Sequence, residues 1–130
     1  MTPEPQHILV LEDNPTHRKI IALHLTRVGF KVTVAAEASK ALALATQSDF
    51  DLIIADYYLP DHPGTDFIRL LREDDGYRHV PVILLTGRAA DLDGTYLCDE
   101  LATLLMPKPC SMAKLVDTVS KFLAVAQGAS

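Results

Sequence analysis

The chain has 130 residues, of which 48% are hydrophobic and 22% charged, a size and composition typical of one folded domain. Its net charge of −5 and pI near 5.4 argue against direct nucleic-acid binding, because nucleic-acid-binding proteins concentrate lysine and arginine on one face. The first residues lack the basic and apolar regions of a secretion signal and no apolar run could span a bilayer, so we expect a cytoplasmic protein without membrane insertion.

Short apolar runs alternate with segments of helical periodicity, which is typical of βαβ units and a parallel sheet. The predicted elements in chain order are a strand at His7 to Leu11, a helix at Pro15 to Val28, a strand at Lys31 to Ala35, a helix at Ala38 to Gln47, a strand at Asp51 to Ala55, a helix at Thr65 to Asp74, a strand at Val80 to Leu85, a helix at Arg88 to Leu101, a strand at Thr103 to Met106, and a helix that Ser111 caps and that ends near Ala126. We infer an α/β domain spanning residues 7–126, with tails at 1–6 and 127–130. Its doubly wound sheet has five parallel strands and helices on both faces.

Local signals differ in strength along the chain. Asn14 is a suitable cap for the first helix, and Gly29 is the expected stop at its other end. The segment from Arg88 to Leu101 has the weakest helical pattern. Gly94 and Thr95 lie in its middle, and each lowers helix propensity by about 0.5 to 1 kcal/mol.

Polar residues follow four of the predicted strands at the point where each strand ends. In chain order they are Glu12 with Asp13, Asp56, Thr86 with Gly87, and Lys108. The carboxyl ends of parallel strands meet at one edge of a sheet, so we expect these side chains to lie close together. Alone, each has an ordinary explanation, as an acid at a helix start, a turn residue or a surface charge. Acids gathered at the centre of the edge would repel one another, however, which favours a divalent metal ion with oxygen ligands beside Lys108.

The same residues resemble the signature of the receiver domains of bacterial two-component response regulators. The resemblance extends from His7 to Leu123, and the matching motifs are the acidic pair Glu12-Asp13, the run from Asp56 to Gly64 with Leu59 and Pro60 inside it, the pair Thr86-Gly87 and the pair Lys108-Pro109. This resemblance implies a flavodoxin-like strand order of 2-1-3-4-5. It also implies a cis peptide before Pro109.

In this interpretation Asp56 is the phosphoacceptor, a carboxylate that attacks the phosphorus of a phosphohistidine and becomes an acyl phosphate. Mg²⁺ is the implied cofactor, with ligands from Glu12, Asp13, Asp56 and, by resemblance, the backbone carbonyl of Tyr58. Lys108 and the Thr86 hydroxyl are expected to contact the phosphoryl oxygens. Such a domain is not an enzyme in the usual sense, because it catalyses only its own phosphorylation and dephosphorylation.

The resemblance also implies partners. A sensor histidine kinase or a histidine phosphotransfer protein would donate the phosphoryl group, as in a phosphorelay, and a downstream protein would be the target. A homodimer is compatible with this function. Direct contact with nucleic acid is not expected.

One departure from the family pattern and two alternatives accompany this interpretation. Leu105 stands where most receivers carry tyrosine or phenylalanine, so the usual output surface of the last two strands is expected to differ. A receiver-fold docking module that acts independently of phosphorylation is the alternative function, although such modules usually lose the acids or the lysine that this chain keeps. An aspartyl phosphatase of the dehalogenase-like kind would need a second aspartate two residues after Asp56, where Tyr58 stands.

Overall fold

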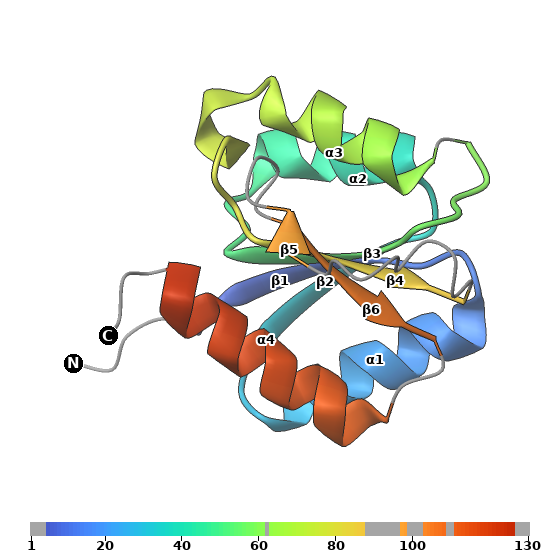
Figure 1. Ribbon diagram of the computed structural model, residues 1–130, viewed down its shortest axis with the longest axis vertical. Coiled ribbons are helices and arrows are strands. Elements are labelled where there is room, and N and C mark those ends of the chain that lie inside the picture. Colours follow the sequence, from blue (N-terminus) through green and yellow to red (C-terminus); the bar gives the residue numbers. More distant parts are fainter. Residues whose placement is uncertain (1–4, 62, 88–96, 99–102, 109–110, 127–130) are drawn as a thin grey trace.

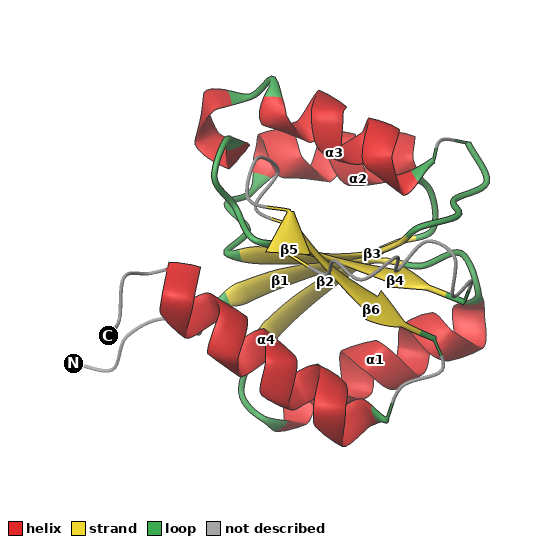
Figure 2. Cartoon of the chain, viewed as in Figure 1, coloured by secondary structure: helices red, strands yellow, loops and turns green. Residues whose placement is uncertain are grey.

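The computed structural model describes residues 5–61, 63–87, 97–98, 103–108 and 111–126. One sheet lies between two layers of helices, with α2 and α3 on one face and α1 and α4 on the other (Figure 1, Figure 2). The elements are β1 His7–Leu11, α1 Pro15–Arg27, β2 Lys31–Ala35, α2 Ala38–Gln47, β3 Leu52–Asp56, α3 Gly64–Arg72, the 3-10 turn η1 Asp75–Tyr77, β4 Val82–Thr86, β5 Leu97–Cys98, β6 Thr103–Pro107 and α4 Met112–Ala126. No helix within the described ranges is both long and apolar enough to cross a bilayer.

Within the described residues the sheet has six strands, in the order β2-β1-β3-β4-β6-β5. The first five in that order are parallel, so the predicted order 2-1-3-4-5 is confirmed, with β6 as the fifth parallel strand. β5 is a short antiparallel addition that pairs with Thr103 and Leu104 of β6. The helix predicted from Arg88 to Leu101 is therefore wrong at Leu97–Cys98, because these residues pair with backbone groups at the open edge of β6. Residues 88–96 and 99–101 of that prediction lie outside the described ranges.

The first helix begins as its sequence predicts. Asn14 Oδ1 accepts hydrogen bonds from the backbone N–H groups of Thr16 at 2.9 Å and His17 at 3.1 Å. At the other end Gly29 has a φ of 105°, a left-handed conformation that suits glycine, and α1 ends at Arg27. The Asn14 cap also fixes the turn between β1 and α1, and this turn carries the first acidic residues of the sheet edge.

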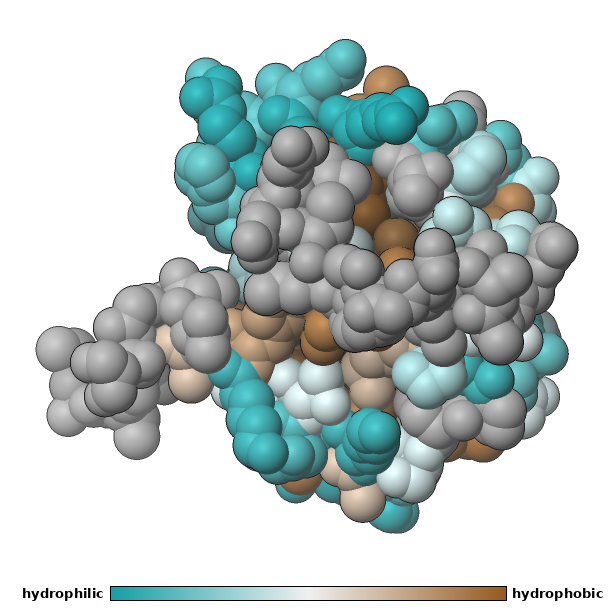
Figure 3. Space-filling view, in the orientation of Figure 1, coloured by the Kyte–Doolittle hydropathy of each residue, from teal (hydrophilic) through white to brown (hydrophobic). Residues whose placement is uncertain are grey.

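Two hydrophobic clusters hold the sheet between its helices. Because alternate residues of a strand face opposite sides, Leu9 and Leu11 of β1 pack in the cluster with α2 and α3, whereas Ile8 and Val10 pack with α1 and α4. β3 and β4 are buried along their whole length, as central strands covered on both faces should be. Figure 3 shows hydrophilic residues on the outer surfaces of α3 and α4. The strand ends are thus held in fixed positions by packing on both sides.

His7 begins β1 at the amino-terminal edge of the sheet, opposite the edge that carries the acids. Its Nε2 lies 2.6 Å from the Thr33 hydroxyl, its ring centroid lies 4.5 Å from that of Phe50, and its backbone N–H donates to Asp51 Oδ2 at 2.7 Å. Burial, together with the positive charge of Lys31, lowers the pKa of His7 below its ordinary value. Folding therefore favours the neutral imidazole.

We expect His7 to make the free energy of unfolding depend on pH. The unfolded chain protonates this histidine near its ordinary pKa of 6.5 and the folded chain only at lower pH, so its stabilisation is complete above that value and is lost as the pH falls. In urea unfolding at about pH 7.5 and about pH 5.5, His7→Gln should lose less stability on acidification than the parent. His79→Gln is the matched control, because it removes an exposed histidine and leaves the contacts of His7 with Thr33 and Phe50 intact. Equal losses in all three proteins would contradict this role of His7.

Candidate functional site

Four parallel strands bring polar residues to their carboxyl ends. Glu12 follows β1, Asp56 ends β3, Thr86 ends β4 and Lys108 follows β6. All four strand ends lie at the same edge of the sheet, as the parallel arrangement requires. Glu12, Asp56 and Thr86 are only 2%, 8% and 1% exposed, so polar groups at this edge are largely removed from solvent.

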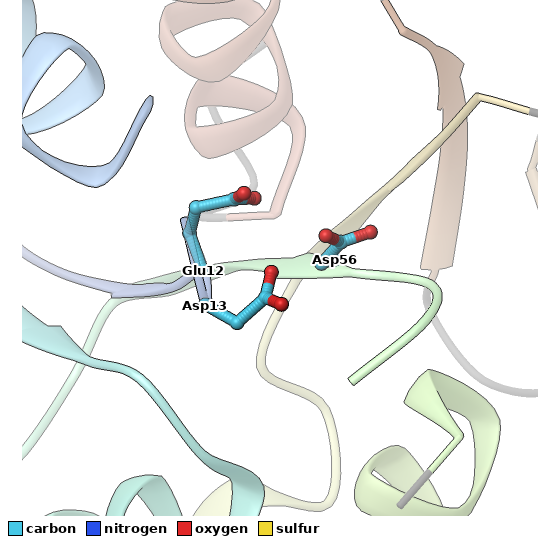
Figure 4. Close-up of side chains that lie close together, drawn as sticks. All are labelled: Glu12, Asp13 and Asp56. Atoms are coloured by element: carbon cyan, nitrogen blue, oxygen red, sulfur yellow. The ribbon is translucent and has the colours of Figure 1, made fainter. Parts of the chain in front are cut away.

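Three carboxylates meet at this edge (Figure 4). Glu12, Asp13 and Asp56 each place an oxygen within 4.8 Å of the oxygens of the other two. Glu12 and Asp56 are buried, whereas Asp13 is exposed. The cluster therefore faces solvent on the side of Asp13, and the closeness of three acids favours a cation among them.

Lys108 supplies positive charge to the two buried acids. Its Nζ lies 3.1 Å from Asp56 Oδ2 and 3.1 Å from Glu12 Oε2. Its backbone N–H donates to the carbonyl of Thr86 at 2.6 Å, which fixes the residue where β4 and β6 end. Buried carboxylates are costly without a partner. The double ion pair therefore stabilises the arrangement of β1, β3 and β6, whose ends carry Glu12, Asp56 and Lys108.

The site retains an excess of negative charge. Burial raises the pKa of Glu12 above its ordinary value; Lys108 opposes this change and Asp56 adds to it. Burial alone would lower the pKa of Lys108, but its hydrogen bond to Asp56 and the charge of Glu12 raise it instead. Lys108 is therefore charged at neutral pH. The oxygens of the acidic cluster fit a hard divalent cation such as Mg²⁺, since one ammonium does not balance three acids.

Arg18 of α1 holds the loop that carries the acidic pair. Its Nη1 donates to the carbonyl of Glu12 at 3.0 Å and lies 3.5 Å from the carbonyl of Asp13. On the other side, the Glu12 N–H donates to the carbonyl of Ala35 at the end of β2 at 3.0 Å. The backbone of the acidic pair is thus held from both α1 and β2.

The loop between Asp56 and Gly64 folds back on itself. The Gly64 N–H donates to the carbonyl of Tyr57 at 2.7 Å, and Tyr58 forms an antiparallel bridge with Pro63. The Tyr58 N–H also donates to Asp56 Oδ1 at 3.3 Å. The two ends of the loop therefore lie together, and this places Asp56 beside the first residue of α3.

Comparison with known proteins places these features in a family. The sequence model of the response regulator receiver domain matches residues 8–120. The chain belongs to this family. It is 28% identical to the polar-differentiation response regulator DivK of Brucella anthropi, over 92% of this chain and 97% of that protein. The protein is accordingly a receiver domain of two-component signal transduction.

Solved receiver structures share the fold. The receiver domain of the sensor histidine kinase PA1611 from Pseudomonas aeruginosa PAO1 is 30% identical, with a TM-score of 0.79 over 92% of this chain and 98% of that one. Its crystal structure has a magnesium ion coordinated in the active-site cleft. A sensor protein from Polaromonas sp. JS666 is 26% identical, with a TM-score of 0.82 over 95% of this chain and 99% of that one.

The receiver-type residues predicted from sequence are largely gathered at one edge. The structure brings together the side chains of Glu12, Asp13, Asp56 and Lys108. Thr86 lies buried at the same edge, where its carbonyl receives the backbone N–H of Lys108. Tyr58 contacts Asp56 through its N–H, and a metal-ligand role for its carbonyl stays a prediction. Pro109, before which a cis peptide is predicted, lies outside the described residues.

Two residues that hold the loops of the site are missed by sequence reasoning, Arg18 and Asp61. The carboxylate of Asp61 accepts hydrogen bonds from the N–H groups of Ala38 and Ser39, both at 3.0 Å. The sequence did contain a signal for Asp61. Glutamate is not among the favoured N-cap residues, so a helix that starts after Glu37 needs another acceptor for its first N–H groups. In the structure the Glu37 side chain indeed makes no capping bond. Arg18 gave no signal, since a basic residue in the first turns of a helix is ordinarily solvated.

Gly64 is expected to tolerate no side chain. A Cβ there would lie 2.9 Å from the Asp56 carbonyl oxygen and 3.0 Å from Leu84 Cδ2. We expect Gly64→Ala to lower the free energy of unfolding by about 1–3 kcal/mol through overpacking, as measured by urea unfolding. Gly87→Ala is the control, because a Cβ there would lie 4.0 Å from the nearest atom, Lys108 Cβ, and should cost less than about 0.5 kcal/mol. Similar costs for both variants would contradict the steric explanation.

Proposed function

We propose that this receiver domain accepts a phosphoryl group on Asp56 in a Mg²⁺-dependent reaction and thereby switches its contacts with other proteins. The observation that carries the proposal is the bridge of Lys108 between Asp56 and Glu12, at 3.1 Å to each. Attack of a carboxylate on a phosphoryl group brings negative charges together, and a fixed ammonium beside the nucleophile offsets them. The cluster faces solvent on the side of the exposed Asp13, and a donor would approach Asp56 from that side.

Asp56 is the nucleophile in this proposal. One of its carboxylate oxygens attacks the phosphorus of a phosphohistidine, the P–N bond breaks, and the imidazole nitrogen leaves with the bonding electrons and takes up a proton. The product is an acyl phosphate on Asp56. Attack of water on the phosphorus later releases inorganic phosphate and restores the carboxylate, so the domain catalyses only its own phosphorylation and dephosphorylation.

Lys108 and Thr86 bind the transferred group. The Nζ of Lys108 is already beside Asp56 and pairs its charge with a phosphoryl oxygen. Thr86 ends β4, which is the direct neighbour of the strand that carries Asp56, and its hydroxyl donates to a second phosphoryl oxygen. The absence of a side chain at Gly87 lets its backbone N–H approach the same group.

Mg²⁺ would be held by carboxylate oxygens of Glu12, Asp13 and Asp56 and by the backbone carbonyl of Tyr58. The closeness of the three carboxylates supports this ligand set, as does the magnesium ion in the related PA1611 receiver structure. When bound, the ion neutralises the charge that develops on the phosphoryl oxygens. Mg²⁺ prefers sites completed by water and phosphate oxygens, so binding to the unphosphorylated domain should be weak.

The proposed donor is a sensor histidine kinase or a histidine phosphotransfer protein in the cytoplasm, and the proposed target is a downstream protein. A homodimer is one form that the switched contact can take. The alternative is a docking module that works without phosphorylation. In that case partner binding would survive replacement of Asp56, whereas the phosphorylation proposal requires it to change.

Asp56→Asn should abolish phosphorylation while leaving the domain folded, because an amide oxygen is a poor nucleophile. Incubation with phosphoramidate or acetyl phosphate and Mg²⁺ should add the mass of one phosphoryl group to the parent, as measured by intact-mass spectrometry. Asp66→Asn, which replaces a half-exposed aspartate on α3, should be phosphorylated like the parent. An adduct that forms on Asp56→Asn, or on the parent without Mg²⁺, would show that the proposal is wrong.

Asp13→Asn should weaken Mg²⁺ binding and slow phosphorylation together, since it removes the charge of the exposed ligand. Loss of an indirect partner of a metal commonly reduces affinity by about tenfold or more, so loss of a direct ligand should cost at least as much. Amide NMR during titration with Mg²⁺ measures the affinity, and Asp66→Asn again controls for the change in net charge. Unchanged affinity in Asp13→Asn would remove this residue from the ligand set.

A further inference from the structure

The first turn of α2 is capped from another part of the chain. Glu37, its N-cap residue, makes no side-chain hydrogen bond to the helix. Asp61 takes this role, since Oδ1 accepts the N–H of Ala38 and Oδ2 accepts the N–H of Ser39, both at 3.0 Å. The first N–H groups of a helix have no partner within the helix. Asp61 satisfies two of them and places negative charge at the positive end of the helix.

Asp61 is ionised in this position. Burial acts to raise its pKa, but the hydrogen bonds from Ser39 and Ala38 outweigh this effect and lower the pKa of Asp61 below its ordinary value. The carboxylate is charged at neutral pH, and its bonds to α2 are therefore of the stronger, charge-assisted kind.

The loop that contains Asp61 starts at Asp56. Close to the site, Tyr58 donates its N–H to Asp56 Oδ1 and pairs with Pro63. Leu59 then packs against the hydrophobic cluster that α2 and α3 cover. Beyond Leu59 the loop becomes exposed, and there Asp61 joins it to α2. A series of contacts therefore connects the backbone next to Asp56 with the start of α2.

We infer that Asp61 is a positioning residue of the phosphorylation site, which fastens the loop after Asp56 to the first turn of α2 and so holds the backbone of Tyr58 in place for the metal. The inference rests on the proposed function, in which the Tyr58 carbonyl is a Mg²⁺ ligand. Because coupling between two sites is reciprocal, Mg²⁺ binding must in turn strengthen the Asp61 cap. The stability of the first turn of α2 and the affinity of the site for Mg²⁺ are thus coupled through the Asp61 cap, a contact outside the sheet.

The test compares Mg²⁺ binding to Asp61→Ala and Glu37→Ala by amide NMR, with the metal alone as the probe. Each variant removes one carboxylate at the start of α2, but only Asp61 makes the capping bonds. Asp61→Ala should raise the Mg²⁺ concentration at half-saturation by about fivefold or more, the lower end of usual coupling between sites. Glu37→Ala should leave it nearly unchanged. Asp61→Asn keeps one acceptor oxygen without the charge and should fall between the two.

Amide hydrogen exchange provides a second readout that does not depend on phosphorylation. In the parent, exchange at Ala38 and Ser39 should slow when Mg²⁺ is added. In Asp61→Ala the exchange should be faster and should not respond to the metal. Circular dichroism at the assay temperature establishes that each variant is folded, and Asp61→Asn carries the comparison if Asp61→Ala does not fold.

The outcomes separate this inference from the function on which it rests. If the parent binds Mg²⁺ and Asp61→Ala binds it as well as Glu37→Ala does, the positioning role is overturned and the proposed function stands. Exchange at Ala38 and Ser39 that ignores Mg²⁺ in the parent overturns the reciprocal link. A parent that binds no Mg²⁺ overturns the proposed function and the positioning role together.

Discussion

One ammonium group ties the edge of the sheet together. The Nζ of Lys108 lies 3.1 Å from carboxylate oxygens of Glu12 and Asp56, which are 96 and 52 positions away in sequence. In the sheet, β4 lies between β6 and β3. A side chain that starts after β6 must therefore extend past β4 to contact both Glu12 and Asp56. Lysine has the length to do so. Without it, two buried carboxylates would lose the ammonium that pairs with both of them, and burial without a partner strongly disfavours charged groups.

The strands position this edge, and the helices position its loops. Arg18 of α1 holds the backbone of the acidic pair, Gly64 at the start of α3 packs directly against the carbonyl of Asp56, and Asp61 joins the same loop to α2. In each case a loop is fixed by contact with the first turns of a helix. The packing of helices onto the sheet, which is governed by apolar side chains remote from the acids, therefore also determines where the acids lie.

The residues at the strand ends are predictable because the carboxyl ends of parallel strands lie at one edge of a sheet. Approximate strand boundaries are therefore enough to group Glu12, Asp56 and Lys108. The link from Asp61 to α2 was not predictable, because its partners are 23 and 22 positions away and a polar loop residue does not reveal which helix it will reach. β5 was missed for a related reason. Leu97–Cys98 pair with β6 through their backbone, and so short a pairing at an edge leaves little trace in the side-chain pattern.

The contacts around the edge differ in how easily they can change. Leu105 of β6 is paired with Leu84 and packs partly buried against the cluster that α2 and α3 cover. As an aliphatic residue it can repack, but it has no aromatic ring and no hydroxyl to move between the core and the surface. The bonds of Asp61 to α2 are polar, one partly buried and one exposed, and such bonds can lengthen or break without opening the hydrophobic core. Among the described contacts of the edge, breaking the hydrogen bonds of Asp61 to α2 therefore costs less free energy than repacking Leu105 of β6.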